Sequence, residues 1–297
     1  MRVFVTGASG FIGYAIVQEL LSAGHDVLGM VRSEDAAKKL TCLGAQPHYG
    51  DLYDFDTIKT GASGCDAVIH TARNRDFSNY KEHCENDRHV IEALASALKG
   101  SSRPLVVTSG VGLMNNFGRL VMEDDQPKSG SDVIPRMATE EAAHAATAAG
   151  VDTYIVRLAP TVHGKGDRGF IPMLINIARE KGVSAYIGKG NNHWPAVNRL
   201  DAALLYRLIA EKRPELKILH AVAEEGYPFR NIATAIGTGL HVPIVSKSAE
   251  DADAYFGSFR YAGLDCQASS VKTHVSTGWQ PKHPGLFDDL IAAGYFD

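Results

Sequence analysis

The chain has 297 residues, 45% of them hydrophobic, and a formal net charge of −4, which fits one large α/β unit or about two ordinary domains. No basic stripe stands out in the sequence, and this argues against nucleic acid as the main partner. The four cysteines lack metal-ligand spacing and no apolar run reaches about 18 residues, so we expect no metal site, no membrane span and a reduced, cytoplasmic protein.

The first half of the chain alternates between short apolar runs and amphipathic segments. Strands that alternate with helices at such spacing form βαβ units. The pattern therefore predicts an α/β fold with a doubly wound parallel sheet of the Rossmann type. The predicted strands cover 2–6, 26–31, 46–49, 67–70 and 105–108, and the predicted helices cover 12–23, 33–40, 54–60 and 85–98.

The second half continues this pattern and then departs from it. A predicted helix at 138–149 and strands at 154–158 and 218–222 extend the sheet. Other stretches, including most of the chain after residue 226, are rich in Gly and Pro or mixed in character. We expect a sheet domain that covers 1–162 plus about 200–223, and a smaller, interleaved C-terminal substrate-binding part that covers 163–199 and 224–297.

Three glycines follow the first predicted strand directly and open the first predicted helix. Gly7 allows a sharp turn, Gly10 lets the backbone approach a phosphate, and Gly13 lets the helix pack close to the strand. The helix N-terminus adds free N–H groups and a partial positive charge. The loop therefore predicts a dinucleotide pyrophosphate site, to which the neighbouring residues Thr6, Ser9, Phe11 and Ile12 also contribute.

This loop resembles that of the short-chain dehydrogenase/reductase superfamily, in its extended, NAD-dependent epimerase/dehydratase branch. Six later segments strengthen the resemblance, and together they extend it over nearly the whole chain. They are Gly50–Leu52, His70–Ala72, Thr108–Ser109, Arg157–Gly164, Leu200–Ala203 and Gly278–Pro281.

The resemblance implies roles for several residues along the cofactor. Asp51 and Leu52 would meet the adenine, and Ser109 would be the catalytic hydroxyl that donates to the substrate oxygen. The other residues that the resemblance places beside the cofactor are His70, Thr71, Ala72, Pro160 and Val162.

The chain departs from the family at the catalytic pair Tyr-x-x-x-Lys. No Tyr lies between Tyr80 and Tyr154, and the segment from Asp132 to Arg136 takes the place of the pair, with 136–140 as a second register. The chain thus resembles the atypical subgroups of the superfamily. Arg136 is a candidate ribose clamp with a catalytic role, although it stays protonated and cannot act as an acid or a base.

The cofactor prediction depends on the end of the second strand. NAD enzymes of this fold place an acidic residue there for the ribose 2′-hydroxyl. Here the position is apolar and Arg32 follows, with donors that suit a 2′-phosphate. We therefore prefer NADP(H), with NAD(H) as the alternative and a solvated surface role as the other interpretation of Arg32.

The missing phenol leaves the proton source open. His163 has a suitable intrinsic pKa and is a third catalytic candidate, and Arg73 and Arg75 are candidates for contact with an anionic substrate. The leading hypothesis is an NADP(H)-dependent oxidoreductase of the atypical short-chain type that acts on a small carbonyl or alcohol. The alternatives are an NAD-dependent nucleotide-sugar epimerase or dehydratase, and a non-catalytic NADP(H)-binding sensor. The long helix at 85–98 would allow a homodimer.

Overall fold

The computed structural model describes residues 1–74 and 78–297. Its largest sheet has seven parallel strands in the order β10-β6-β5-β4-β1-β2-β3. The topological switch point lies between β1 and β4, and sheets of this kind bind ligands at the carboxyl ends of the strands there. The strands are β1 (Arg2–Thr6), β2 (Asp26–Val31), β3 (Gln46–Tyr49), β4 (Ala67–His70), β5 (Pro104–Gly110), β6 (Asp152–Leu158) and β10 (Ile218–Ala221).

Helices cover both faces of this sheet, so its strands are apolar on both sides. Val3 and Val5 pack on one face with α1 (Phe11–Ser22), α2 (Glu34–Leu43) and α7 (Arg199–Lys212). Phe4 packs on the other face with α3 (Phe55–Ser63), α4 (Tyr80–Leu98) and α5 (Ala138–Ala148). The predicted doubly wound α/β fold is confirmed.

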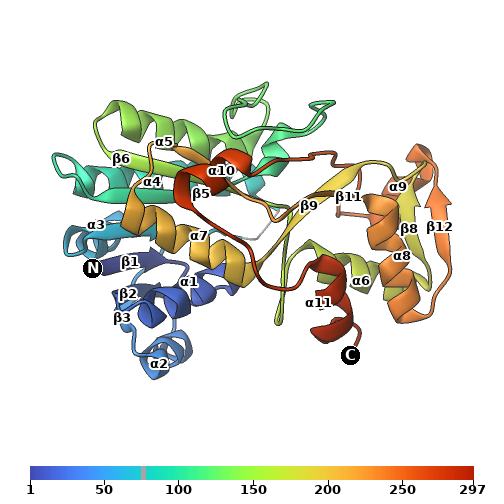
Figure 1. The fold of residues 1–297 in the computed structure, drawn as a ribbon, viewed down its shortest axis with the longest axis horizontal. Helices are drawn as coiled ribbons and strands as arrows, with labels where there is room; N and C mark the ends of the chain where they lie inside the picture. The colour runs from blue at the N-terminus through green and yellow to red at the C-terminus, as the bar shows by residue number, and fades with distance from the viewer. Residues whose placement is uncertain (75–77) are drawn as a thin grey trace.

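Two smaller sheets lie at the other end of the molecule, to the right in Figure 1. One has the order β11-β9-β7 and the other pairs β12 with β8. Their strands are β7 (Thr161–His163), β8 (Ser184–Ile187), β9 (His193–Asn198), β11 (Glu224–Pro228) and β12 (Ile244–Lys247). The helices α6 (Phe170–Lys181), α8 (Phe229–Leu240), α9 (Ala249–Phe256) and α11 (Leu286–Ala292) lie with these sheets. The remaining helix, α10 (Val271–Thr277), packs against α7 and β10 of the large sheet.

A second core fills the space between these smaller elements. Trp194 is fully buried there, with its ring 4.9 Å from that of Phe229 and 5.7 Å from that of Phe170. Trp194 therefore serves as a core residue. The same strand, β9, also sends Val197 into the core of the large sheet, so β9 belongs to both cores.

Several helices differ from the sequence prediction, which gives no helix for α6, α8, α9, α10 or α11. α4 begins at Tyr80 instead of residue 85, because Tyr80 and Cys84 continue the inward face of the helix by one more turn. α6 was not indicated by the sequence because it contains Pro172. This proline is the third residue of the helix, where its missing N–H leaves no intrahelical bond unmade. No helix of the described residues is both long and apolar enough to cross a bilayer.

Candidate functional site

The glycine loop lies at the carboxyl end of β1 and is packed so closely that it excludes side chains. Gly7 has φ +70°, and a Cβ added to it would lie 2.7 Å from the Ala72 nitrogen. A Cβ added to Gly13 would lie 2.1 Å from the Gly7 carbonyl oxygen. The Gly10 N–H closes the turn by donating to Gly7 O at 2.8 Å. Only glycine fits Gly7 and Gly13, as a close backbone cradle requires.

The N-terminus of α1 opens onto this cradle. The helix begins at Phe11, its N-cap Gly10 provides no side-chain bond, and its first turn has no acidic residue. Its first backbone N–H groups are therefore available to an anion. Ser9 is exposed beside them, and Phe11 and Ile12 are half-buried. The residues present thus fit the pyrophosphate that the sequence predicts.

Arg199 also reaches this helix end, and the sequence analysis missed it. Its guanidinium carbon lies 5.0 Å from the centroid of the Phe11 ring. Arg199 is the first residue of α7 and lies far from the loop in sequence, so no local pattern indicates the contact.

The predicted adenosine end lies beside β2 and β3. β2 ends in Met30 and Val31, both buried, and Arg32 follows as an exposed residue. Asp51 accepts a bond from the Tyr53 N–H at 3.0 Å, and the Leu52 carbonyl accepts one from the Asn86 amide at 3.1 Å. The acidic partner for a ribose 2′-hydroxyl is therefore absent from the end of β2, and a cation follows it.

The end of β4 is hydrogen-bonded to the end of β1. The Thr71 hydroxyl donates to Thr6 O at 2.8 Å, and the Ala72 N–H donates to the Thr6 hydroxyl at 3.3 Å. The same hydroxyl is 2.7 Å from Nδ1 of His70, which is buried. The predicted residues Thr6, His70, Thr71 and Ala72 thus lie together around the glycine loop.

Arg136 belongs to the same cluster through Asp87, a residue that the sequence analysis did not single out. Arg136 Nη1 donates to Asp87 at 2.7 Å and its Nη2 donates to the Thr108 carbonyl at 2.8 Å. His70 Nε2 lies 2.9 Å from the other Asp87 oxygen. Burial alone would raise the pKa of Asp87, but Arg136, His70 and Thr139 hold it well below its usual value.

Tyr80 places a phenol on the same face of α4, one helical turn before Cys84 and two before Asp87. The Arg73 guanidinium lies 5.6 Å from the centroid of its ring. Burial raises the pKa of Tyr80 above 10.0 against the charges of Arg73 and Arg136, so the phenol is protonated at neutral pH. The other candidate arginine, Arg75, lies outside the described residues.

Ser109 is 5% exposed, and its hydroxyl donates to Glu140 at 2.7 Å. Arg157 donates two hydrogen bonds to the same carboxylate, from Nε at 2.9 Å and from Nη2 at 2.8 Å. Burial would raise the pKa of Glu140, but Arg157 and Ser109 lower it. The structure therefore places Ser109 in a buried ion-pair network rather than in the bonds around Asp87.

His163 lies in β7, fully buried, with Nδ1 2.6 Å from Asp289 and Nε2 3.8 Å from Glu224. Burial lowers its pKa, but the two carboxylates outweigh burial and raise it. Among the neighbouring predicted residues, Pro160 is half-buried between β6 and β7, and Val162 packs against the core of the large sheet. His163 is thus hydrogen-bonded to α11 and lies close to the Glu224 carboxylate of β11.

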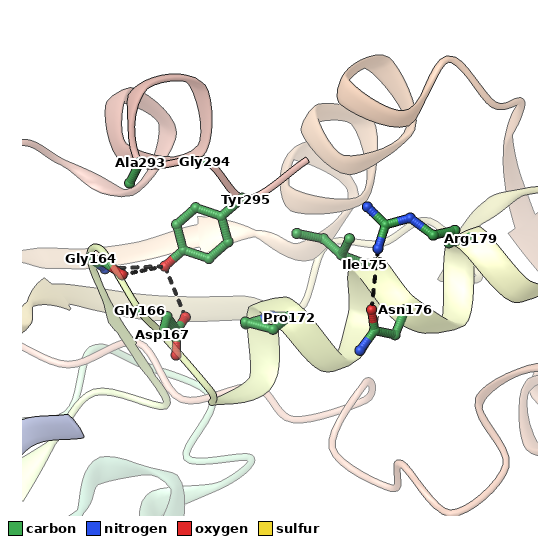
Figure 2. A pocket seen from close by; sticks show the side chains of 10 residues that line it. All are labelled: Gly164, Gly166, Asp167, Pro172, Ile175, Asn176, Arg179, Ala293, Gly294 and Tyr295. Carbon is green, nitrogen blue, oxygen red and sulfur yellow. Dashed lines mark hydrogen bonds between the residues drawn. The ribbon is translucent and has the colours of Figure 1, made fainter. Parts of the chain in front are cut away.

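A pocket of about 170 Å³ lies between α6 and the C-terminal segment. Figure 2 shows the Tyr295 hydroxyl at its edge, which accepts from the Gly164 N–H at 3.1 Å and donates to Asp167 at 2.9 Å. None of the residues that the sequence predicts for the cofactor or for catalysis lines this pocket. It is therefore separate from the glycine-loop site.

The chain matches known proteins over most of its length. The model of the NAD dependent epimerase/dehydratase family matches residues 3–221. The chain is 48% identical over 300 residues to "Uncharacterized protein C2A9.02" of Schizosaccharomyces pombe, and 100% of each chain is covered. It is 32% identical over 189 residues, 61% of this chain and 56% of the relative, to the 4-hydroxy-2-methyl-3-oxo-4-farnesyl-3,4-dihydroquinoline-1-oxide ketoreductase of Stigmatella aurantiaca.

A solved structure shares the fold. It is the dTDP-glucose 4,6-dehydratase DesIV of Streptomyces venezuelae with NAD bound, at a TM-score of 0.78 and 17% identity, with 99% of this chain and 96% of the other covered. The family match, the glycine loop and the parallel sheet agree with one another. The chain belongs to the NAD dependent epimerase/dehydratase family, within the extended short-chain dehydrogenase/reductases.

Proposed function

We propose that the protein is an NADP(H)-dependent oxidoreductase that acts on a small carbonyl or alcohol. The observation that carries this proposal is the open N-terminus of α1 over the glycine loop, with exposed Arg32 after the apolar end of β2. A guanidinium offers several donors to a phosphate, and a 2′-phosphate is what distinguishes NADP from NAD. The bound cofactor would supply or accept a hydride.

The residues of the chain hold the two ends of the dinucleotide in this proposal. Gly7, Gly10 and Gly13 shape the loop so that the free backbone N–H groups at the start of α1 bind the pyrophosphate, and Arg32 binds the 2′-phosphate. Arg136 donates to the nicotinamide ribose in place of the usual Lys. Asp132 is exposed, whereas Tyr80 presents a protonated phenol near Arg136.

The reductase proposal draws support from the Stigmatella relative, whose name is that of a ketoreductase. Ser109 and His163 stay catalytic candidates, although each is engaged in buried bonds in this structure. That engagement favours a second candidate function, a non-catalytic NADP(H)-binding sensor. The epimerase or dehydratase alternative draws support from the description of the family and from structural neighbours at low identity, such as DesIV.

The test is NADPH oxidation with a panel of small ketones and aldehydes, followed at 340 nm. We expect turnover with at least one carbonyl. If the Tyr80 phenol is the proton donor, Tyr80→Phe should lower kcat at least about tenfold, because general acid catalysis contributes roughly 10²- to 10⁴-fold. Tyr186→Phe, a half-buried tyrosine of β8, is the matched control and should keep its activity. Tight NADPH binding without turnover of any carbonyl would favour the sensor instead.

A further inference from the structure

Asp87 is a buried carboxylate that accepts hydrogen bonds from three side chains, each from a different element of the fold. It lies in α4 and is 5% exposed. One oxygen is 2.9 Å from His70 Nε2, and the other accepts from Arg136 Nη1 at 2.7 Å and from the Thr139 hydroxyl. A carboxylate stays ionised in the interior only when such partners replace its lost hydration.

The carboxylate fixes the state of His70. Because a carboxylate only accepts, Nε2 of His70 carries a proton, and in the neutral ring Nδ1 is then an acceptor. The Thr6 hydroxyl, 2.7 Å from Nδ1, donates to it. Thr6 immediately precedes Gly7. The orientation of the imidazole therefore helps to fix the backbone at the start of the glycine loop.

The carboxylate also fixes Arg136 and offsets its charge. Arg136 donates to Asp87 and to the carbonyl of Thr108, and the Thr108 hydroxyl in turn donates to the His70 carbonyl at 2.7 Å. These bonds use two guanidinium nitrogens, and a guanidinium has five N–H donors. The pair Asp87–Arg136 is neutral overall, which suits the neutral hydroxyls of a ribose better than a phosphate.

We propose that Asp87 is a positioning residue for the nicotinamide end of the dinucleotide, holding Arg136 and His70 in their binding orientations and leaving phosphate recognition to Arg32. This inference rests on the proposed NADP(H) binding. In this inference Arg136 takes the place of the Lys of the usual catalytic pair, and Asp87 of α4 holds Arg136 in position.

The test compares Asp87→Asn with the matched control Glu123→Gln. Glu123 is also a fully buried carboxylate, but it bonds to Thr273. NADPH dissociation constants are measured by fluorescence, and the His70 Nε2 proton is observed by NMR without cofactor. We expect Asp87→Asn to weaken NADPH binding about tenfold or more and to shift this resonance upfield, because bonds to charged groups are lost. Glu123→Gln should change neither.

The outcomes separate this inference from the proposed function. Equal NADPH affinity of wild type and Asp87→Asn overturns the inference while dinucleotide binding stands. A wild type that binds NADPH but reduces no carbonyl defeats the reductase and leaves the inference supported if Asp87→Asn still weakens binding. A wild type that binds neither dinucleotide overturns both.

A double variant keeps the test decisive if Asp87→Asn unfolds. Asp87→Asn/Arg136→Met removes both charges of the pair, so no uncompensated charge stays buried. We expect it to bind NADPH no more than about threefold more weakly than Arg136→Met alone, since residues that act through one another are non-additive. A further loss of about tenfold overturns the inference.

Discussion

At the residue scale, Arg32 carries the choice between the two dinucleotides. It is exposed directly after β2, where the preceding residues Met30 and Val31 are buried and apolar. We predict that Arg32→Ala weakens NADPH binding about tenfold or more and leaves NADH binding unchanged, because only NADPH offers a phosphate to the guanidinium. Titration by fluorescence measures both. Arg230→Ala, an exposed arginine on α8, should change neither affinity, and a parallel loss for both cofactors would refute the assignment.

Residues whose role follows from local sequence were the predictable part of the site. The spacing of Gly7, Gly10 and Gly13 indicates a cradle, and the structure shows the crowding that requires glycine. Asp87 and Arg199 escaped prediction because their contacts join residues 17 and more positions apart, and an acidic residue on a helix looks like a solvated one. The signal for Asp87 was its place on the inward face of α4, three residues before Val90 and four before Ile91.

At the element scale, the pair Arg157–Glu140 joins β6 to α5, and both side chains are fully buried. We predict that Glu140→Gln lowers the free energy of unfolding by about 3–5 kcal/mol, since it leaves the Arg157 charge buried and unpaired. Urea unfolding measures this. Glu85→Gln removes a partly exposed partner of Arg88 and should cost less than about 1 kcal/mol. Equal costs for the two variants would contradict this account.

His163 joins β7 to α11 through Asp289, and its raised pKa makes the connection dependent on pH. Because folding favours the protonated ring, the stabilisation is complete below about pH 6.5 and is lost as pH rises through the folded-state pKa. We predict that the stability difference between wild type and His163→Gln shrinks as pH rises above about 6.5. Buried His220 has a lowered pKa, so its contribution to stability changes with pH in the opposite direction. Both proteins contain His220, and its contribution therefore cancels in the difference between them. A difference that stays constant with pH would rule out this role.

At the scale of the whole molecule, β9 couples the two cores. Val197 packs in the large core and Trp194 in the smaller one. Trp279 also packs in the large core, where its indole N–H donates to the Asp201 carbonyl at 2.8 Å. The chain has only two tryptophans, so Trp279→Phe and Trp194→Phe each leave one reporter. We predict that both variants, unfolded in urea and followed by fluorescence and circular dichroism, show coincident transitions. Separate midpoints for the two probes in one variant would show independent units.

The large sheet could be predicted from sequence because its strands are short apolar runs separated by helices of ordinary length. The predicted strand 218–222 indeed joins β6 at the edge of the sheet, although some sixty residues separate them. The smaller sheets could not be predicted. β7, β9 and β11 come from distant segments, and their pairing is set by tertiary packing around Trp194 rather than by a local period.

The most direct test of the account is the pair of dissociation constants of the wild-type protein for NADPH and NADH. The glycine loop and Arg32 together predict that both dinucleotides bind and that NADPH binds about tenfold or more tightly, since a phosphate gains bonds to a charged donor. Equal affinities, or tighter binding of NADH, would contradict the account.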